Sequence, residues 1–572
     1  MRKTMKKIVS MLVSFVMVMG IFATAMAAQT PLDITITKPG DDKATHKYSA
    51  YQIFTGDIYE DPATGEKSLI NLQFGEGVDA AALRTALGLA ATATAQECAD
   101  AIQTNYATDA EGLADLLRGT EPDYTDSILT TATDDATIAP AVTTAVLDVT
   151  GPGYYFILDE LTNASDADKG AISNFMLKVV EDTDVTVESK EDLPTITKVI
   201  DENGGVSANT ASIGDEIPFK ITSTVPDMTG YNKYYFIVND VLCPGLTYDA
   251  TSADLTVSVG GTALTADTGY TLTVSPDTPT AGETTLKIVF NNFIQYTTGD
   301  EVVITYNAIL NEDCDRTDAG NENTVDLTYS NDPNHTYTGT NEPDNGEPTG
   351  VTPPSNTITY TTDIKLIKLD ESNAALTGAE FEVACTSGMS KVLVTYGEYE
   401  VDASGAYWKL NDGTYTTTAP TPLTASKYDS ETTKYSLTDK TEVQTDATSS
   451  KKVTAFVDSS GFLVIEGLCD GTYTITETKA PAGYTGLSAP VSFTVESNPD
   501  LTGPNWAVGA SGNTASATYN TTDNQFEVTI VNTQGINLPT TGGIGTVIFY
   551  VTGGILLLGG AVMLLRKKEQ QD

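Results

Sequence analysis

Few of the side chains that usually carry catalysis or metal binding occur in this sequence. Its 572 residues include only two histidines, two tryptophans and five cysteines. Neither His46 nor His335 lies in a zinc-protease motif or near a nucleophile pattern, and a phosphate-binding loop is absent. No stretch has the ligand spacing of a calcium loop. We therefore expect a protein that is not an enzyme, binds no metal and needs no cofactor.

Positive charge is also scarce. The chain has 31 basic and 77 acidic side chains, which gives a formal net charge of -46 at pH 7. Nucleic acid and anionic membranes are negatively charged themselves, so this balance excludes both as partners. It fits a surface protein that must stay dispersed at high local density.

Long apolar runs stand only at the two ends of the chain. Residues 1–27 combine a basic start, an apolar stretch and a small-residue cleavage pattern, which predicts a secretory signal peptide and a mature chain that starts near Ala28. Residues 544–565 are long enough to span a bilayer at ~1.5 Å per residue. The basic residues 566–568 favour a tail inside the cell, so we expect everything between the two runs to lie outside.

The region between these ends has the pattern of short β-strands. Alternating runs such as DLTVSV, YTLTVS and EVVITYNAIL indicate β-sandwich domains. Helical periodicity occurs mainly in Asp79–Arg118. Two turn-forming seams, KEDLPT and NEPDNGEPTGVTPPSN, divide the chain into units of residues 28–192, 193–360 and 361–535. We predict an all-β fold of tandem immunoglobulin-like sandwiches, the N-terminal one with a helical insertion.

All five cysteines fall in the exported part. A disulfide is possible in the second unit and another in the third, if the compartment is oxidising. We favour a bridge between Cys385 and Cys469, and leave the pairing of Cys243 with Cys314 open because geometry decides it. Cys98 would then be left over. The alternative is that the cysteines are buried free thiols.

The apolar run near the C-terminus follows a short polar motif, which consists of Leu538, Pro539, Thr540, Thr541 and Gly542. Motif, apolar span and basic tail together resemble the sorting signal of Gram-positive surface proteins. In that family a sortase cuts LPxTG between Thr and Gly and transfers the Thr carbonyl to an amine. The resemblance implies a sorting signal over residues 538–572, with the membrane span as a temporary hold. An ordinary membrane anchor with a chance motif is the alternative.

The third unit begins TTDIKLIKLDESNAALTGAEFEVAC, contains DGTYTITETKAPAGY and ends FEVTIVNTQGINLPTTG. It resembles a CnaB-type domain of sortase-assembled pilins. The resemblance implies an isopeptide bond between Lys368 and Asn532, promoted by Glu477. The competing nucleophile, Lys365, is expected on the opposite face of its strand. Burial would keep the lysine neutral and the glutamate protonated, so that the amine attacks the Asn carboxamide and ammonia leaves.

The second unit contains TITKVIDENGG, YYFIVNDVLCPGLTYD and GNENTVDLTYSNDP. It resembles the middle domain of backbone pilins, a CnaA/CnaB-type sandwich in which Lys, Asp and Asn play the same parts. The matching residues are Lys198, Asp240 and Asn323, with Asn321 as the competing asparagine. The first unit resembles the N-terminal domain of major pilins but offers no asparagine at a strand end, since Asn174 comes too early. We expect no isopeptide bond there.

Backbone pilins carry a polymerising lysine after a V-x-V run, usually as YPK. In VTVESKEDLP, Lys190 takes that place, although Glu188 and Ser189 replace Tyr and Pro. Lys178 and Lys198 are alternatives, and Lys190 as an ordinary linker lysine is another.

Taken together, the resemblance implies a structural shaft subunit of a covalent pilus, attached to the cell wall after export. Its expected partners are pilin-class and housekeeping sortases, identical subunits, minor pilins and peptidoglycan, with host surface proteins also allowed. The alternative function is a wall-anchored adhesin or minor pilin that binds a host surface protein.

Overall fold

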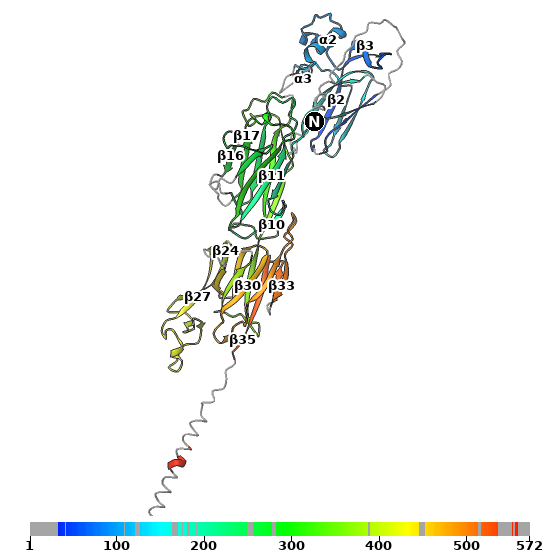
Figure 1. Ribbon diagram of the computed structural model, residues 1–572. Helices are drawn as coiled ribbons and strands as arrows, with labels where there is room; N and C mark the ends of the chain where they lie inside the picture. The colour runs from blue at the N-terminus through cyan, green and yellow to red at the C-terminus, as the bar shows by residue number, and fades with distance from the viewer. Residues whose placement is uncertain are drawn as a thin grey trace, which may run out of the picture.

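The protein is described as a computed structural model. The residues whose structure is described are 32–40, 42–107, 109–119, 126–162, 170–173, 175–179, 184–189, 192–248, 255–276, 282–333, 335–386, 389, 391–445, 452–512, 516–535, 552 and 555–558. Three β-rich units follow one another along the chain and in space (Figure 1). Within these described ranges, no helix is both long and apolar enough to cross a membrane.

The N-terminal unit pairs a three-stranded sheet, in the order β5-β1-β8, with a five-stranded sheet, in the order β3-β2-β6-β7 with β4 beside β2. Its strands are β1 (Leu32–Thr37), β2 (His46–Glu60), β3 (Lys67–Phe74), β4 (Asp134–Ile138), β5 (Thr144–Val149), β6 (Gly153–Leu161), β7 (Phe175–Val179) and β8 (Val185–Glu188). The expected strand alternation is visible in β1, where every second residue is buried.

Three helices interrupt this unit between β3 and β4, and confirm the helical insertion. They are α1 (Ala80–Ala86), α2 (Ala95–Tyr106) and α3 (Ala110–Arg118). Each begins at a residue whose side chain accepts backbone N–H bonds, and Thr94 with Glu97 forms a full capping box at α2. Leu83, Cys98 and Leu117 pack the helices onto Phe54 of β2.

The middle unit is a sandwich of two sheets. The first has the order β15-β14-β18-β11-β9 with β13 beside β18, and the second has the order β10-β21-β19-β12-β17-β16 with β20 beside β19. The strands and one short helix are β9 (Ile196–Ile200), β10 (Ala208–Thr210), β11 (Glu216–Thr224), β12 (Phe236–Leu242), β13 (Leu246–Thr247), β14 (Thr256–Val259), β15 (Thr262–Ala263), β16 (Tyr270–Ser275), β17 (Thr284–Phe290), η1 (Phe293–Gln295), β18 (Glu301–Leu310), β19 (Asn321–Ser330), β20 (Thr349–Val351) and β21 (Ser355–Tyr360).

The C-terminal unit is built on one continuous ladder of strands in the order β31-β35-β22-β29-β24-β28-β23-β30-β32-β33, with β27 beside β24 and β34 beside β35. The strands are β22 (Thr362–Asp370), β23 (Glu380–Cys385), β24 (Lys391–Val401), β27 (Tyr435–Thr445), β28 (Lys452–Phe456), β29 (Phe462–Leu468), β30 (Gly471–Lys479), β31 (Tyr484–Thr485), β32 (Val491–Glu496), β33 (Ala507–Gly512), β34 (Ser516–Asn520) and β35 (Gln525–Gln534). Its first strand, β22, and its last, β35, run parallel to each other as neighbours.

A lobe of residues 402–434 projects from this unit at the end of the β24–β27 hairpin (Figure 1). It contains β25 (Trp408–Lys409), β26 (Tyr415–Thr416) and η2 (Ala425–Lys427). Stacked tyrosines hold its base, with the ring centroids of Tyr399 and Tyr415 3.8 Å apart and the ring planes nearly parallel. The lobe was not predicted from the sequence, because its short strands look like those of the sandwich.

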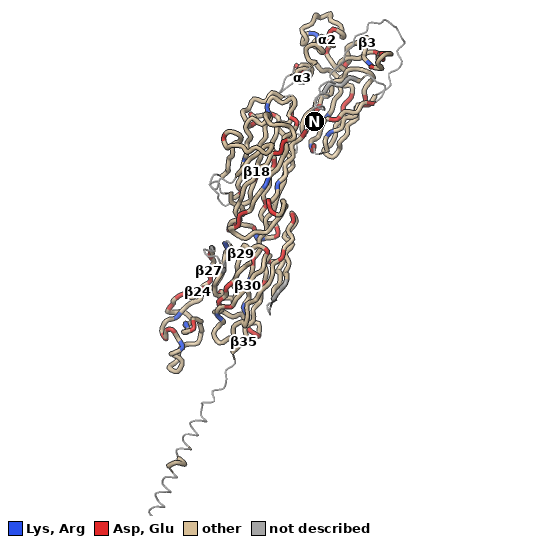
Figure 2. The backbone as a smooth tube through the Cα atoms, viewed as in Figure 1, with Lys and Arg blue, Asp and Glu red and all other residues tan. Residues whose placement is uncertain are grey.

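Both junctions between units are hydrogen bonded. Asn331 of the middle unit accepts a bond from the backbone of Ile172 at 2.8 Å and donates one to the carbonyl of Gly170 at 3.0 Å. At the other junction, Arg316 pairs with Asp363 at 3.4 Å and with Glu466 at 3.1 Å. Acidic side chains are spread over all three units (Figure 2), as the composition predicts.

Candidate crosslinking sites

The core of the middle unit contains a cluster of polar side chains from both sheets. Lys198 on β9 and Tyr306 on β18 come from one sheet, while Asp240 on β12 and Asn323 on β19 come from the other. All four residues are at most 2% exposed. Asp240 pairs with Val325, two positions from Asn323, so the acid and the amide share one face of their sheet. The two sheets thus bring together the three residues expected from the sequence, Lys198, Asp240 and Asn323. Tyr306 is a fourth member of the cluster that was not expected.

Tyr306 is the centre of the hydrogen bonds in this cluster. Its hydroxyl accepts from Lys198 Nζ at 2.9 Å and from Asn323 Nδ2 at 2.7 Å, and donates to Asp240 Oδ2 at 2.6 Å. Lys198 Nζ also contacts Asp240 Oδ1 directly. Asn323 Oδ1 is buried and has no hydrogen-bond partner among the residues that the structure describes. An unbonded buried carbonyl is costly, so its presence here calls for an explanation.

The electrostatics make Lys198 easier to deprotonate than an exposed lysine. Burial lowers the pKa of Lys198 to about 8, although Asp240 raises it. The Lys198 ammonium lies 5.0 Å from the ring centre of Phe219 and 5.3 Å from that of Tyr306. Burial, and the Asp240 charge, raise the pKa of Tyr306 well above its usual value, so this phenol keeps its proton.

The competing asparagine, Asn321, is used elsewhere. Its side chain donates to the carbonyls of Asp315 at 2.9 Å and Thr359 at 3.1 Å, and accepts from the amide of Asp315 at 2.8 Å. These bonds fix the loop before β19. The geometry therefore favours Asn323 over Asn321 as the partner of Lys198.

A second cluster lies in the C-terminal unit. Lys368 on β22, Asn532 on β35 and Glu477 on β30 meet there, and the side chains of Lys368 and Glu477 are fully buried. Asn532 Nδ2 donates to Glu477 Oε1 at 2.7 Å, and Lys368 Nζ lies 3.9 Å from the same oxygen. Glu477 Oε2 accepts from the amide of Leu487 at 2.7 Å. Like Asn323 Oδ1, Asn532 Oδ1 is buried and has no hydrogen-bond partner within the described part of the chain.

Lys368 is the inward-facing lysine of its strand. Burial lowers its pKa to about 8, although Glu477 raises it. Its Nζ donates to the carbonyl of Ile530 at 3.2 Å. Lys365 lies on the other face, half-buried, with its Nζ 4.5 Å from the ring centre of Phe462. The period of two along a strand explains this difference, because an odd spacing changes the face.

The N-terminal unit holds a buried charge cluster that sequence reasoning missed. His46 Nδ1 lies 2.8 Å from Asp159 Oδ1, and His46 Nε2 lies 3.0 Å from Asp42 Oδ2. Lys38 Nζ donates to the carbonyl of Asp42 at 2.6 Å, and the amide of Ser173 donates to Asp159 at 3.0 Å. Burial opposes protonation of His46, but the two carboxylates raise its pKa to about 10. The cluster is therefore an ion network around a histidinium.

Lys190, Asn174 and the side chain of Lys178 lie outside the described residues. The neighbours of Lys190 are anchored on both sides. The amide of Ser189 donates to the carbonyl of Thr37 in the N-terminal unit, and Asp192 accepts from the amide of Asp227 in the middle unit.

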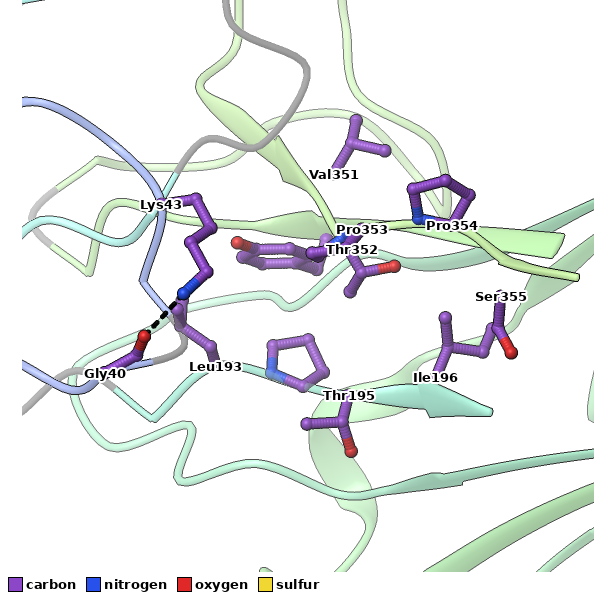
Figure 3. A pocket seen from close by; sticks show the side chains of 12 residues that line it. Gly40, Lys43, Leu193, Thr195, Ile196, Val351, Thr352, Pro353, Pro354 and Ser355 are labelled. Atoms are coloured by element: carbon purple, nitrogen blue, oxygen red, sulfur yellow. Dashed lines mark hydrogen bonds between the residues drawn. The ribbon is translucent and has the colours of Figure 1, made fainter. Parts of the chain in front are cut away.

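A cavity of about 520 Å³ opens just after this linker (Figure 3). Leu193, Pro194, Tyr329 and Pro353 of the middle unit line it, together with Lys43 of the N-terminal unit. Lys43 Nζ donates to the carbonyl of Gly40 at 2.6 Å. The walls of the cavity are mostly apolar and contain several prolines.

The sorting motif, Leu538–Gly542, and almost all of the predicted membrane span, residues 544–565, also lie outside the described residues. The five cysteines lie within the described residues, and all five are free thiols. The structure thus lacks the Cys385–Cys469 disulfide that the sequence led us to favour. Both thiols are buried, and burial raises the pKa of Cys469 to about 11.

Comparison with known proteins agrees with these features. Residues 213–333 match the family described as "Gram-positive pilin backbone subunit 2, Cna-B-like domain", and residues 362–504 match a prealbumin-like fold domain. Residues 530–572 match the LPXTG cell wall anchor motif. The trypsin-resistant surface T6 protein of Streptococcus pyogenes serotype M6 is 27% identical over 396 residues, which cover 64% of this chain and 67% of the relative.

Solved structures of pilins are also similar to the chain. The T6 backbone pilin of serotype M6 Streptococcus pyogenes has a TM-score of 0.43 at 19% identity, with 82% of this chain and 81% of that chain covered. The full-length major pilin SpaD of Corynebacterium diphtheriae has a TM-score of 0.40 at 15% identity, with 89% and 99% covered. The domain matches and the T6 relative identify the chain as a homologue of Gram-positive backbone pilins, with Cna-B-like and prealbumin-like domains and an LPXTG anchor motif.

Proposed function

We propose that this protein is the shaft subunit of a covalent, cell-wall-attached pilus, stabilised by two internal Lys–Asn isopeptide bonds. The observation that carries the proposal is the pair of buried Lys–acid–Asn clusters in a chain that ends in a cell wall anchor motif. The protein is a structural one and has no catalytic turnover, because each crosslink would form once within its own fold.

The same chemistry fits both clusters. A neutral lysine amine attacks the Asn side-chain carbonyl carbon, the acid returns a proton to the amide nitrogen, and ammonia leaves as the new amide forms. The lowered pKa of Lys198 and of Lys368 increases the fraction of neutral amine available to react. The unbonded Asn carbonyl oxygens, in Asn323 and Asn532, leave each reacting carbonyl free of competing bonds.

Polymerisation would use two residues, Lys190 and Thr541, that lie on either side of both clusters in the sequence. A sortase would cut after Thr541 and join it to Lys190 of the neighbouring subunit, so the partners are sortases and further copies of this chain, with peptidoglycan as the final anchor. The anchored neighbours of Lys190 support this, because load entering there passes directly into the middle unit.

This path explains where the clusters occur. Tension from Lys190 to Thr541 runs through the middle and C-terminal units, which hold the crosslinking clusters. The N-terminal unit lies off the path and holds an ion network around His46 instead. A noncovalent network is sufficient in a domain that carries no load.

The intact mass of reduced recombinant residues 28–541, followed by peptide mapping, tests the crosslinks. We expect the mass to be lower by two ammonia molecules, with Lys198 joined to Asn323 and Lys368 to Asn532. An unmodified mass would contradict the crosslinks and leave a wall-anchored adhesin with noncovalent domains. Replacement Lys190→Ala in the producing cell should then abolish the high-mass ladder of covalent polymers, and an unchanged ladder would exclude Lys190.

A further inference from the structure

The two clusters differ in how the acid reaches the asparagine. In the C-terminal unit, Glu477 Oε1 accepts directly from Asn532 Nδ2 at 2.7 Å and faces Lys368 Nζ at 3.9 Å. One carboxylate can therefore take a proton from the amine and give it to the leaving nitrogen.

In the middle unit the acid has no such direct contact. Asp240 contacts Lys198 Nζ through Oδ1, and its other oxygen, Oδ2, accepts from the Tyr306 hydroxyl at 2.6 Å. Among the residues that the structure describes, Asp240 makes no hydrogen bond with Asn323; the Nδ2 of Asn323 bonds to Tyr306 instead, at 2.7 Å. The proton taken from Lys198 therefore has one connected route to the leaving nitrogen, through the tyrosine.

We propose that Tyr306 is the proton relay for the Lys198–Asn323 crosslink, an assignment that rests on the proposed function. Lys198 first gives a proton to Asp240. Its neutral amine then attacks the Asn323 side-chain carbon, forming the new C–N bond. Tyr306 passes its hydroxyl proton to Nδ2 and takes the proton held by Asp240. The bond from that carbon to Nδ2 then breaks and ammonia leaves. The second proton of the lysine amine passes to Asp240, so that the new amide is neutral and Asp240 ends protonated.

The surroundings of Tyr306 suit a relay. Its ring stacks on Phe219, with centroids 5.4 Å apart, and meets Tyr248 edge-on at 5.8 Å, so two aromatic neighbours fix its position. The residue is 2% exposed, which keeps bulk water from substituting for the hydroxyl. Three hydrogen bonds to three different partners leave the hydroxyl in one orientation.

The test compares the full chain with its Tyr306→Phe variant, made by cell-free synthesis and quenched in denaturant at successive times. Peptide mapping follows the Lys198–Asn323 and Lys368–Asn532 crosslinks separately, so the C-terminal unit is an internal control for folding and quenching. We expect the middle-unit crosslink to form about 100-fold more slowly in the variant, the usual scale for a lost general acid–base group. The C-terminal crosslink should form at the unchanged rate.

A second version separates proton transfer from packing. A ring-fluorinated tyrosine at position 306 keeps the hydroxyl and nearly the same shape but has a more acidic phenol. A relay makes the crosslinking rate depend on this acidity, whereas a purely structural tyrosine does not. An unchanged rate in both versions would overturn the relay. If the unmodified chain itself lacks the Lys198–Asn323 bond, the proposed function fails for this unit instead.

Discussion

Lys368 and Asn532 face the same core from neighbouring parallel strands, displaced by two positions in register. Lys368 pairs with Ile530, and Asn532 pairs with Asp370. The amine and the amide thus lie diagonally across one strand boundary, between the first and the last strand of the unit. A bond between them would close a loop that contains nearly the whole unit, so pulling on the two ends would load the bond and not the sheet.

The identity of the nucleophile can be tested with the two lysines of β22. Lys368→Ala should abolish the crosslink of the C-terminal unit and lower its unfolding free energy by on the order of 5 kcal/mol, by analogy with a disulfide that closes a long loop. Lys365→Ala should leave the crosslink intact, because that lysine packs on Phe462 at the other face. Intact mass and thermal unfolding measure both effects. Loss of the crosslink in the Lys365 variant would contradict the assignment.

The middle unit offers a matched pair of asparagines. Asn323→Ala should prevent the loss of one ammonia molecule, whereas Asn321→Ala should keep the crosslink and only loosen the loop at Asp315. Both side chains are at most 1% exposed, so the two substitutions remove comparable buried groups. A missing crosslink in both variants would mean that local folding, not chemistry, was lost.

The ion network of the N-terminal unit predicts a pH dependence. Burial disfavours the charged form of His46, but Asp159 and Asp42 raise its pKa to about 10, above the ordinary 6.5. Below pH 6.5 the histidine is protonated in both folded and unfolded chains. Between about pH 6.5 and 10 only the folded chain keeps the proton, so stability falls as pH rises, by up to ~1.4 kcal/mol per unit.

Thermal unfolding of the full chain and of its His46→Gln variant would measure this effect. The stability difference between them should be largest below pH 6.5 and should shrink toward pH 10. A difference that stays constant over this range would show that His46 is not charged in the folded unit.

The junction between the middle and C-terminal units depends on a glycine. Gly467 has a φ of +77°, its carbonyl accepts from the amide of Ile213, and an added Cβ would collide with the Ile213 side chain. Gly467→Ala should therefore destabilise the junction by about 1–3 kcal/mol and change the angle between the units. Small-angle scattering and limited proteolysis would detect this. Gly413→Ala is the control, because Gly413 has a similar φ of +82° but an added Cβ there would meet only the end of the Lys479 side chain, at an ordinary contact distance of 3.5 Å.

The sequence predicted the all-β architecture, the helical insertion and the residues that meet in the two crosslinking clusters. Strand and helix periodicity predicted the architecture, whereas the cluster residues followed from the resemblance to pilin domains. Lys198, Asp240 and Asn323 all interrupt buried positions of alternating strands, where a charged or amide side chain needs a special reason.

The features that the sequence did not predict depend on contacts between residues far apart in the chain. In EVVITYNAIL, Tyr306 occupies an inward position like Ile304 and Ala308, and nothing local distinguishes a relay from an ordinary core tyrosine. The partners of His46 come from a preceding turn and from β6, over a hundred residues later. Cys385 and Cys469, which we favoured as a disulfide, are free thiols in the structure, as in the alternative that the sequence left open.

The lobe at residues 402–434 has a consequence for how such a surface could change over evolutionary time. It extends from the β24–β27 hairpin, where Val401 at the end of β24 is 73% exposed, and Leu423 within the lobe is 94% exposed. Neither hairpin strand lies between Lys368 and Asn532 on the path of force. Selection can therefore alter the length, charge and outline of the lobe while the tensile strength of the fibre stays the same.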